Sequence, residues 1–253
     1  MPDVTDRSTE SQPGGRVGRI MSEFVAAFQV MDQIPLAVSV FGSARTQPGS
    51  PHYVMAQELG RKLGERGLAV ITGGGPGIME AANKGAFEAA GISVGLNIFL
   101  PKEQRANPYQ TVSLDFRYFF CRKVMFVKYA IAFVCFPGGF GTLDEFFESM
   151  TLIQTGKAER FPVLLVGVDF WAPLIDWLGN RLVRTNAFID TGDMDLFTVT
   201  DDVAEVVERI ISCRPRTPIA PTPAAPAADR VTEEGTQQGR PPSHPDGPAQ
   251  GPP

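Results

Sequence analysis

Short apolar runs alternate with amphipathic stretches along most of the chain. The apolar runs have the length of β-strands, and strands are expected at residues 36–41, 68–72, 93–99, 132–136, 163–166 and 197–200. The stretches between them predict helices at residues 51–66, 77–90, 119–130, 142–155, 171–183 and 202–212. Strands this apolar are buried on both faces. The alternation therefore predicts an α/β, Rossmann-like doubly wound fold, with a mainly parallel sheet and helices on both faces.

A further helix is expected before the first strand. Apolar residues recur at helical spacing from Val17 to Met31, which predicts an amphipathic helix that packs on the domain or on a partner subunit. Residues 1–15 are polar, and residues 214–253 hold half of the 22 prolines. Such segments bury too little apolar surface to offset chain entropy. We therefore expect disordered ends at 1–15 and 214–253 around a single nucleotide-binding domain at 16–213.

Charge and hydropathy exclude several classes of partner. The formal net charge is −5 and no cluster of Lys and Arg is dense, so nucleic acid is not an expected partner. The polar N-terminus lacks the pattern of a signal peptide, and the apolar run at 130–136 is too short to span a membrane. We therefore expect a cytoplasmic protein without a membrane segment.

Cysteine and histidine usage limits the possible chemistry. Cys121, Cys135 and Cys213 form no C-x-x-C pair, so a disulfide framework is not expected. His52 and His244 are the two histidines of the chain, which leaves almost no material for a Ser-His-Asp triad or a histidine-rich metal site. No metal is expected, and catalysis would depend on carboxylates, arginine, lysine and backbone N–H groups.

Three glycine-rich loops follow expected strands. They are Gly42-Ser43-Ala44-Arg45, Gly73-Gly74-Gly75-Pro76-Gly77 and Pro137-Gly138-Gly139-Phe140-Gly141-Thr142. Because the carboxyl ends of parallel strands meet at one edge of a sheet, these loops should converge. Glycine lets the backbone approach a ligand, and the following helix offers free N–H groups to an anion. The spacing matches neither the dinucleotide fingerprint nor the P-loop, so the loops predict a site for the phosphate of another small molecule.

The third loop resembles a known motif. Residues 137–145, P-G-G-F-G-T-L-D-E, resemble the P-G-G-x-G-T-x-x-E motif of the Lonely Guy (LOG) family of cytokinin riboside 5′-monophosphate phosphoribohydrolases. Arg122-Lys123 stands at the spacing of that family's R-K pair, and residues 73–79 are similar to its G-G-G-x-x-G-x-M loop with the later glycine one position early. The resemblance covers about residues 36–213. Relatives often carry the label lysine decarboxylase, but no lysine stands out as a Schiff-base residue for pyridoxal phosphate, and no cofactor is expected.

The resemblance implies roles for individual residues. Arg122 and Glu145 would form the catalytic pair. Lys123 and the loop at 138–142 would hold phosphate and ribose, Thr151 would line the pocket, and Glu103 would contact ribose or base. The full set of implied substrate-binding residues is Ser43, Gly73, Gly74, Gly75, Glu103, Lys123, Gly138, Gly139, Phe140, Gly141, Thr142 and Thr151. The family's pocket lies across a dimer interface, so a homodimer or larger homo-oligomer is expected.

The chemistry of base removal agrees with the implied catalytic pair. Cleavage of a purine from ribose develops an oxocarbenium-like centre, which a fixed carboxylate such as Glu145 can stabilise while it activates water. A guanidinium such as Arg122 can hold a carboxylate and a phosphate through bidentate hydrogen bonds. The hypothesis is a hydrolase of N-glycosyl bonds that converts a purine nucleotide 5′-monophosphate, with adenine or N6-prenyladenine as base, to free base and ribose 5-phosphate.

Alternative interpretations of the same residues remain open. Thr142 and Glu145 also have the spacing of a helix capping box, Arg122 alone also fits a surface ion pair, and Thr151 also fits a hydroxyl bound to its own helix. The fold would also suit a non-catalytic carrier of a nucleotide or pterin cofactor, or a scaffold whose glycines are structural. A carrier has no need of the Arg122 and Glu145 pair, so that pair distinguishes it from an enzyme.

Overall fold

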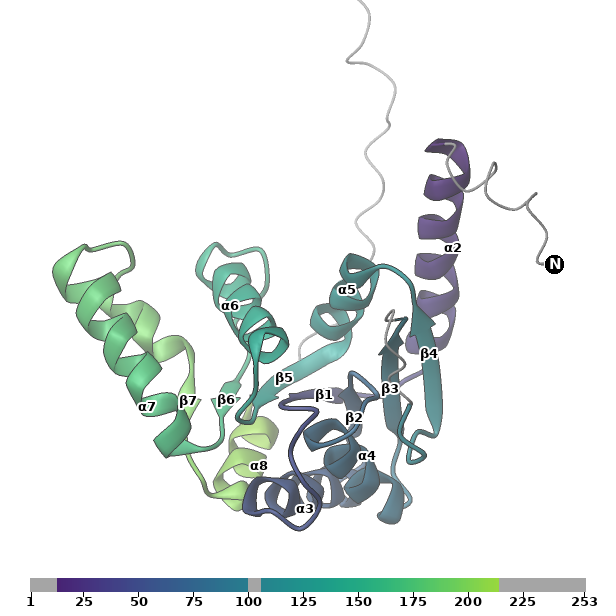
Figure 1. Cartoon of the computed structure of the whole chain (residues 1–253), viewed down its shortest axis with the longest axis horizontal. Helices are drawn as coiled ribbons and strands as arrows, with labels where there is room; N and C mark the ends of the chain where they lie inside the picture. Colours follow the sequence, from purple (N-terminus) through teal and green to yellow (C-terminus); the bar gives the residue numbers. More distant parts are fainter. Residues whose placement is uncertain (1–12, 100–105, 214–253) are drawn as a thin grey trace, which may run out of the picture. The chain divides into compact units, whose positions relative to one another are not determined.

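In the computed structural model, which describes residues 13–99 and 106–213, seven strands form one sheet (Figure 1). Their order is β4-β3-β2-β1-β5-β6-β7, and every neighbouring pair is parallel. The strands are β1 (Ala37–Phe41), β2 (Ala69–Thr72), β3 (Ser93–Ile98), β4 (Val112–Phe116), β5 (Ala130–Cys135), β6 (Val163–Leu165) and β7 (Thr198–Val199). The predicted Rossmann-like α/β fold is confirmed.

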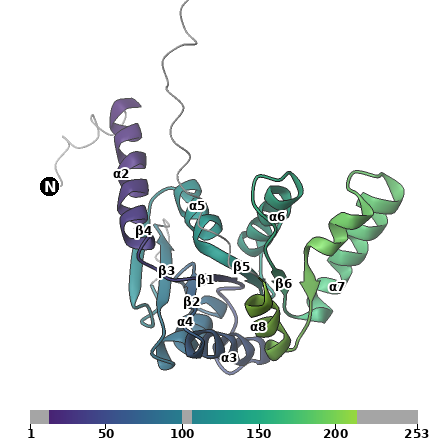
Figure 2. The same cartoon turned by 180° about the vertical axis from the view of Figure 1, so that it is seen from behind.

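Helices cover both faces of this sheet (Figures 1 and 2). Helices α3 (Pro51–Glu65), α4 (Ile78–Glu88) and α8 (Val203–Ser212) lie on one face. Helices α2 (Pro13–Met31), α5 (Phe119–Tyr129), α6 (Phe140–Gln154) and α7 (Val168–Trp177) pack into the core on the other. A π-helix, η2 (Leu178–Thr185), continues α7, and a 3-10 helix, η3 (Thr191–Leu196), precedes β7. This arrangement leaves the strand ends as the place for a ligand.

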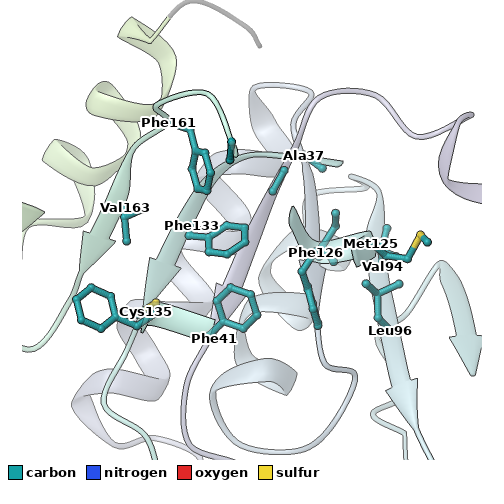
Figure 3. Packing of buried hydrophobic residues seen from close by; sticks show 14 of the residues in the cluster. Ala37, Phe41, Val94, Leu96, Met125, Phe126, Phe133, Cys135, Phe161 and Val163 are labelled. Atoms are coloured by element: carbon teal, nitrogen blue, oxygen red, sulfur yellow. The ribbon is translucent and has the colours of Figure 1, made fainter. Parts of the chain in front are cut away.

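Side-chain alternation along the strands builds a separate core on each face. In β1, Ala37 and Phe41 point into the layer under α5 and α6, whereas Val38 and Val40 point into the layer under α3 and α4. The Phe41 ring lies 4.9 Å from the Phe126 ring and 5.0 Å from the Phe133 ring, both near edge-to-face (Figure 3). Such aromatic packing stabilises the carboxyl end of the sheet beneath the glycine loops.

The strand order reverses between β1 and β5. From β1 the chain proceeds through β2 and β3 to one edge at β4, and from β5 it proceeds through β6 to the other edge at β7. At such a switch point the connections leave in opposite directions, so a crevice opens beyond the carboxyl ends of the two central strands. Both flanking loops, at Gly42 and at Pro137, begin there.

The edge strand β4 was not among the predicted elements. Its Val112, Leu114 and Phe116 alternate with the exposed Ser113 and Asp115, the pattern of a strand with one solvated face. A search for continuous apolar runs does not detect a strand in which apolar and polar residues alternate.

The predicted boundaries of the domain can be compared with the first and last described residues. Helix α2 begins at Pro13, inside the segment for which disorder is predicted, while residues 1–12 and 214–253 lie outside the described residues. Within 13–99 and 106–213, no helix has both the length and the apolar character that crossing a membrane requires.

Candidate functional site

The three glycine loops are joined by backbone hydrogen bonds through Ser43. Ser43 N donates to Pro137 O at 3.0 Å, and Ser43 O accepts from Ile78 N at 3.1 Å. The close approach requires glycine at two places. A Cβ on Gly77, whose φ is +69°, would lie 2.3 Å from Ser43 O, and a Cβ on Gly42 would lie 2.6 Å from the Ile78 side chain. The loops after β1, β2 and β5 therefore converge at one edge of the sheet, as expected.

A cavity of about 620 Å³ opens between these loops and helix α5. Eight of the predicted site residues line it: Ser43, Gly73, Arg122, Gly139, Phe140, Gly141, Thr142 and Glu145. The other lining residues were not predicted: Phe41, Gly42, Ala44, Arg45, Met79, Ile98, Phe119 and Phe126. Arg45 was part of a recognised glycine loop, so its position gave a usable signal. The large apolar lining residues lie in strands and helices around the cavity. Sequence alone does not show that they face it, because this depends on how the strands and helices pack.

Arg122 is held between two aromatic rings. Its Cζ lies 5.2 Å from the Phe119 ring centroid and 5.7 Å from the Phe126 ring centroid, within cation–π range. Burial lowers the Arg122 pKa, and the charges of Glu145 and Asp144 act in the opposite direction. Its Nε is buried and has no hydrogen-bond partner among the described residues. Arg122 is therefore a desolvated cation with a free donor, and it is not a surface ion-pair residue.

Glu145 is the buried carboxylate of the site. It is only 5% exposed, and its Oε2 has no hydrogen-bond partner in the part of the chain that the structure describes. Burial raises the Glu145 pKa to about 7, despite the opposing charges of Lys123 and Arg122. Native proteins leave few buried polar atoms unpaired, and such groups gather where a ligand completes them.

The capping-box interpretation of Glu145 is wrong. Helix α6 begins at Phe140 with Gly139 as its N-cap, and no side chain caps it. Thr142 therefore lies inside the first turn and donates its backbone N–H to Gly139 O at 3.0 Å. Glu145 falls in the second turn, where its carboxylate is beyond reach of the cap. The helix begins two residues before its predicted start, because the extended Gly139 is the N-cap and Phe140 and Gly141 already belong to the first turn.

Lys123 lies outside the lining of the cavity. Its Nζ is 2.8 Å from Asp144 Oδ2, 2.8 Å from Glu148 Oε2 and 4.0 Å from Glu145 Oε1. Burial lowers the Lys123 pKa, but the hydrogen bonds to Asp144 and Glu148 outweigh it, so the pKa is raised. The ammonium is therefore committed to carboxylates of α6, and it holds that helix against α5.

The first turn of α6 presents unpaired donors to the cavity. Within residues 13–99 and 106–213, no acceptor faces the N–H groups of Gly139, Phe140 and Gly141. A Cβ added to Gly139 or Gly141 would meet nothing within 4 Å, whereas a Cβ on Gly138 would lie 2.1 Å from Thr142 Oγ1. Packing within the protein thus requires glycine at Gly138 only. The open space at the other two leaves room for an anion at the helix N-terminus.

Gly74, Gly75 and Thr151 do not line the cavity. The carbonyl of Gly74 accepts from Asn107 N and from Gln110 Nε2, and the carbonyl of Gly75 accepts from Asn107 Nδ2. Thr151 Oγ1 donates to Phe147 O at 2.8 Å, as in the alternative that it bonds its own helix. These three residues have internal partners in the described chain. Glu103 lies outside the described residues.

Comparisons with known proteins give the following relatives. The family model described as possible lysine decarboxylase matches residues 79–210. A cytokinin riboside 5′-monophosphate phosphoribohydrolase of Rhodococcoides fascians is 26% identical over 181 residues, covering 70% of this chain and 90% of that protein. The X-ray structure of the protein TM1055 is 27% identical with a TM-score of 0.54, covering 71% of this chain and 100% of that one.

A more distant solved structure shares only the fold. The molybdenum cofactor binding protein of Rippkaea orientalis is 17% identical with a TM-score of 0.52, covering 71% of this chain and 97% of that one. At this identity the likeness concerns the arrangement of strands and helices and carries nothing about the ligand.

Pyridoxal phosphate, which a lysine decarboxylase needs, does not fit this cavity. A Schiff base forms from a neutral lysine amine, yet no lysine is among the described residues that line the cavity. Lys123, which is nearby, is held by Asp144 and Glu148, and its pKa is raised. Within 13–99 and 106–213, no group of three or more His, Cys, Asp and Glu side chains could hold a metal ion.

The burial of Glu145 makes a prediction about stability. The carboxyl has a pKa of about 7 in the folded chain and an ordinary value of 4.5, so ionisation in the folded state costs stability as pH rises from about 4.5 to 7. We expect Glu145→Gln to melt at a higher temperature than wild type at pH 8, by roughly 2–4 °C for each kcal/mol recovered, with the gap narrowing toward pH 5.

Calorimetry at both pH values measures this difference. Glu159→Gln, which changes an exposed carboxylate outside the cavity, is the control and should melt as wild type does. A Glu145→Gln protein that melts below wild type at pH 8 would show that the ionised carboxylate stabilises the fold on balance.

Proposed function

Since the chain belongs to the Lonely Guy family, to which the possible lysine decarboxylase model corresponds, we propose that it hydrolyses a purine nucleotide 5′-monophosphate to free base and ribose 5-phosphate. The observation that carries this proposal is the buried Glu145 carboxylate, unpaired at Oε2 in the described chain, in a cavity that Arg122 also lines. The phosphoribohydrolase of Rhodococcoides fascians gives the substrate class by analogy.

Glu145 and Arg122 have different roles in the proposed reaction. The bond between C1′ of ribose and N9 of the purine breaks, its electron pair leaves with the base, and positive charge develops on the sugar. Ionised Glu145 stabilises that charge and takes a proton from the water that attacks C1′, and this proton is then passed to N9 of the leaving base, which restores the carboxylate. Arg122, fixed between Phe119 and Phe126, keeps a positive charge beside the carboxylate and orients the nucleotide.

Two competing functions receive less support from the site. Decarboxylation of lysine would need a reactive lysine in the cavity, and the described lining has none. A carrier of a nucleotide or pterin cofactor would need the glycine loops but not a desolvated carboxylate, which costs stability without improving the binding of an anion.

The proposal predicts selective release of base from monophosphates. Purified protein incubated with AMP or isopentenyladenosine monophosphate should release free base, which chromatography measures, and adenosine should be cleaved with a kcat/KM lower by about 10²-fold or more. The physical reason is that the phosphate end supplies binding energy that positions the reacting bond. If no purine monophosphate releases base, the proposed function is refuted. If kcat/KM is equal for AMP and adenosine, the role of the phosphate is refuted.

A second prediction separates catalysis from folding at Glu145. We expect Glu145→Gln to lower kcat on AMP by about 10²-fold or more while the protein still binds ribose 5-phosphate. In wild type, kcat/KM should fall as pH drops through about 7, because protonation removes the carboxylate form that acts. Turnover of the variant near the wild-type rate, measured beside its melting temperature, would end the catalytic assignment.

We also propose that the chain assembles as a homodimer. Val17, Met21 and Val25 form an exposed apolar row along α2. Helix α2 packs against α5 (Figure 2). Helix α5 in turn exposes Phe120 and Val124. Light scattering should give at least twice the chain mass, and a Met21→Lys, Val25→Lys double variant should shift the protein toward monomer. Ser22→Lys, on the same helix outside the row, is the control. A wild-type protein that is monomeric and fully active would contradict this proposal.

A further inference from the structure

One guanidinium at the cavity is not used by the catalytic pair. Arg45 lines the cavity and is exposed, and none of its side-chain nitrogens has a hydrogen-bond or ion-pair partner among the described residues. Two exposed arginines on helices have carboxylate partners. Arg61 pairs with Glu65, and Arg209 pairs with Glu205 at 2.8 Å, each within one helix. Arg45 thus brings a free positive charge to the cavity.

The backbone that carries Arg45 is fixed. Arg45 N donates to Ser43 Oγ at 3.1 Å, and Arg45 O accepts from Gln47 Nε2 at 3.2 Å. Ser43 in turn bonds the loops after β5 and β2 through its own N–H and carbonyl. The Cα of Arg45 is therefore anchored to the same backbone as the cavity walls, while its long side chain is free to turn toward a ligand.

Among the described residues that line the cavity, Arg45 is the cation that remains available to a phosphate. Lys123, which the family resemblance assigned to the phosphate, is committed to Asp144 and Glu148. Arg122 lies beside the buried Glu145, between two aromatic rings, and serves the reacting end. A phosphate monoester carries up to two negative charges at neutral pH and would enter a cavity that already contains the Glu145 carboxylate. The N–H groups at the start of α6 offer partial charge, and Arg45 offers a full one.

From this juxtaposition we propose that Arg45 binds the phosphate of the substrate, together with the free N–H groups of Gly139, Phe140 and Gly141, and so makes the enzyme selective for monophosphates over nucleosides. The inference rests on the proposed function for the identity of the substrate. Its chemical basis is the planar guanidinium, which donates two parallel hydrogen bonds to phosphate oxygens and stays charged at any working pH.

Titration calorimetry tests the inference without depending on turnover. Wild type, Arg45→Ala and Arg45→Lys are titrated with ribose 5-phosphate, and, in the slow Glu145→Gln background, with AMP and adenosine. We expect Arg45→Ala to weaken ribose 5-phosphate and AMP about 10- to 100-fold and to leave adenosine unchanged, since only the charge-assisted contact is lost. Arg45→Lys should regain part of the affinity as a point charge without the bidentate geometry.

Kinetics and a matched control complete the test. With Glu145 present, Arg45→Ala should raise KM for AMP by the same factor and change kcat by less than about threefold, because the contact is present in ground and transition states alike. Arg181→Ala, an exposed arginine on η2 outside the cavity lining, should leave every value unchanged.

The outcomes separate this inference from the proposed function. Three outcomes would each overturn the role of Arg45. The Arg45→Ala variant could bind ribose 5-phosphate as tightly as wild type, or lose the same affinity for AMP and for adenosine. Wild type itself could fail to bind ribose 5-phosphate. Failure of wild type to release base from any monophosphate would instead overturn the proposed function, while a loss of ribose 5-phosphate affinity in Arg45→Ala would still establish Arg45 as the phosphate-binding residue.

Discussion

The backbone of Ser43 is the constraint on which the site depends. Its N–H and its carbonyl bond the loops that follow β5 and β2, so three walls of the cavity share one rigid connection. This connection is possible because β1 and β5 are neighbours where the strand order reverses, and the chain leaves their ends in opposite directions. Glycine at Gly42 and Gly77 allows the backbones to come this close. Sheet topology and residue size together therefore fix the backbone of the Arg45 loop relative to the loop that leads into α6 and Glu145.

The aromatic core connects this geometry to the electrostatics. Phe41 and Phe126 pack edge to face in the core, and both also line the cavity (Figure 3). The Glu145 carboxyl lies in the lining of the same cavity, and its burial raises its pKa to about 7. A buried polar atom without a partner costs about 1–3 kcal/mol, which the large apolar core of the sheet can offset. Phe41 and Phe126 thus belong both to the core and to the cavity in which Glu145 titrates near neutral pH.

The fold and the main loops were predictable from sequence because they depend on local patterns. Apolar runs predicted six of the strands, and the motif at residues 137–145 with the Arg122-Lys123 pair before it pointed to Arg122 and Glu145. What sequence could not give depends on three-dimensional packing. Lys123 follows Arg122 directly, yet only the helical geometry of α5 and α6 shows that it bonds Asp144 and Glu148. Likewise, Arg45 was visible in its loop, but its free charge is evident only once its surroundings are known.

The glycines of the three loops fall into two groups, one required by packing within the protein and one that packing does not explain. Gly42, Gly74, Gly77 and Gly138 each have a neighbouring atom where a Cβ would lie, so the chain's own packing requires them, as in a purely structural scaffold. Gly139 and Gly141 have open space there and ordinary backbone angles available to any residue, so packing gives no reason for their lack of a side chain. Both line the cavity beside N–H groups that have no acceptor within residues 13–99 and 106–213. A purely structural role therefore accounts for the first group but not for Gly139 and Gly141. An anion bound at the start of α6 accounts for glycine at both of these positions.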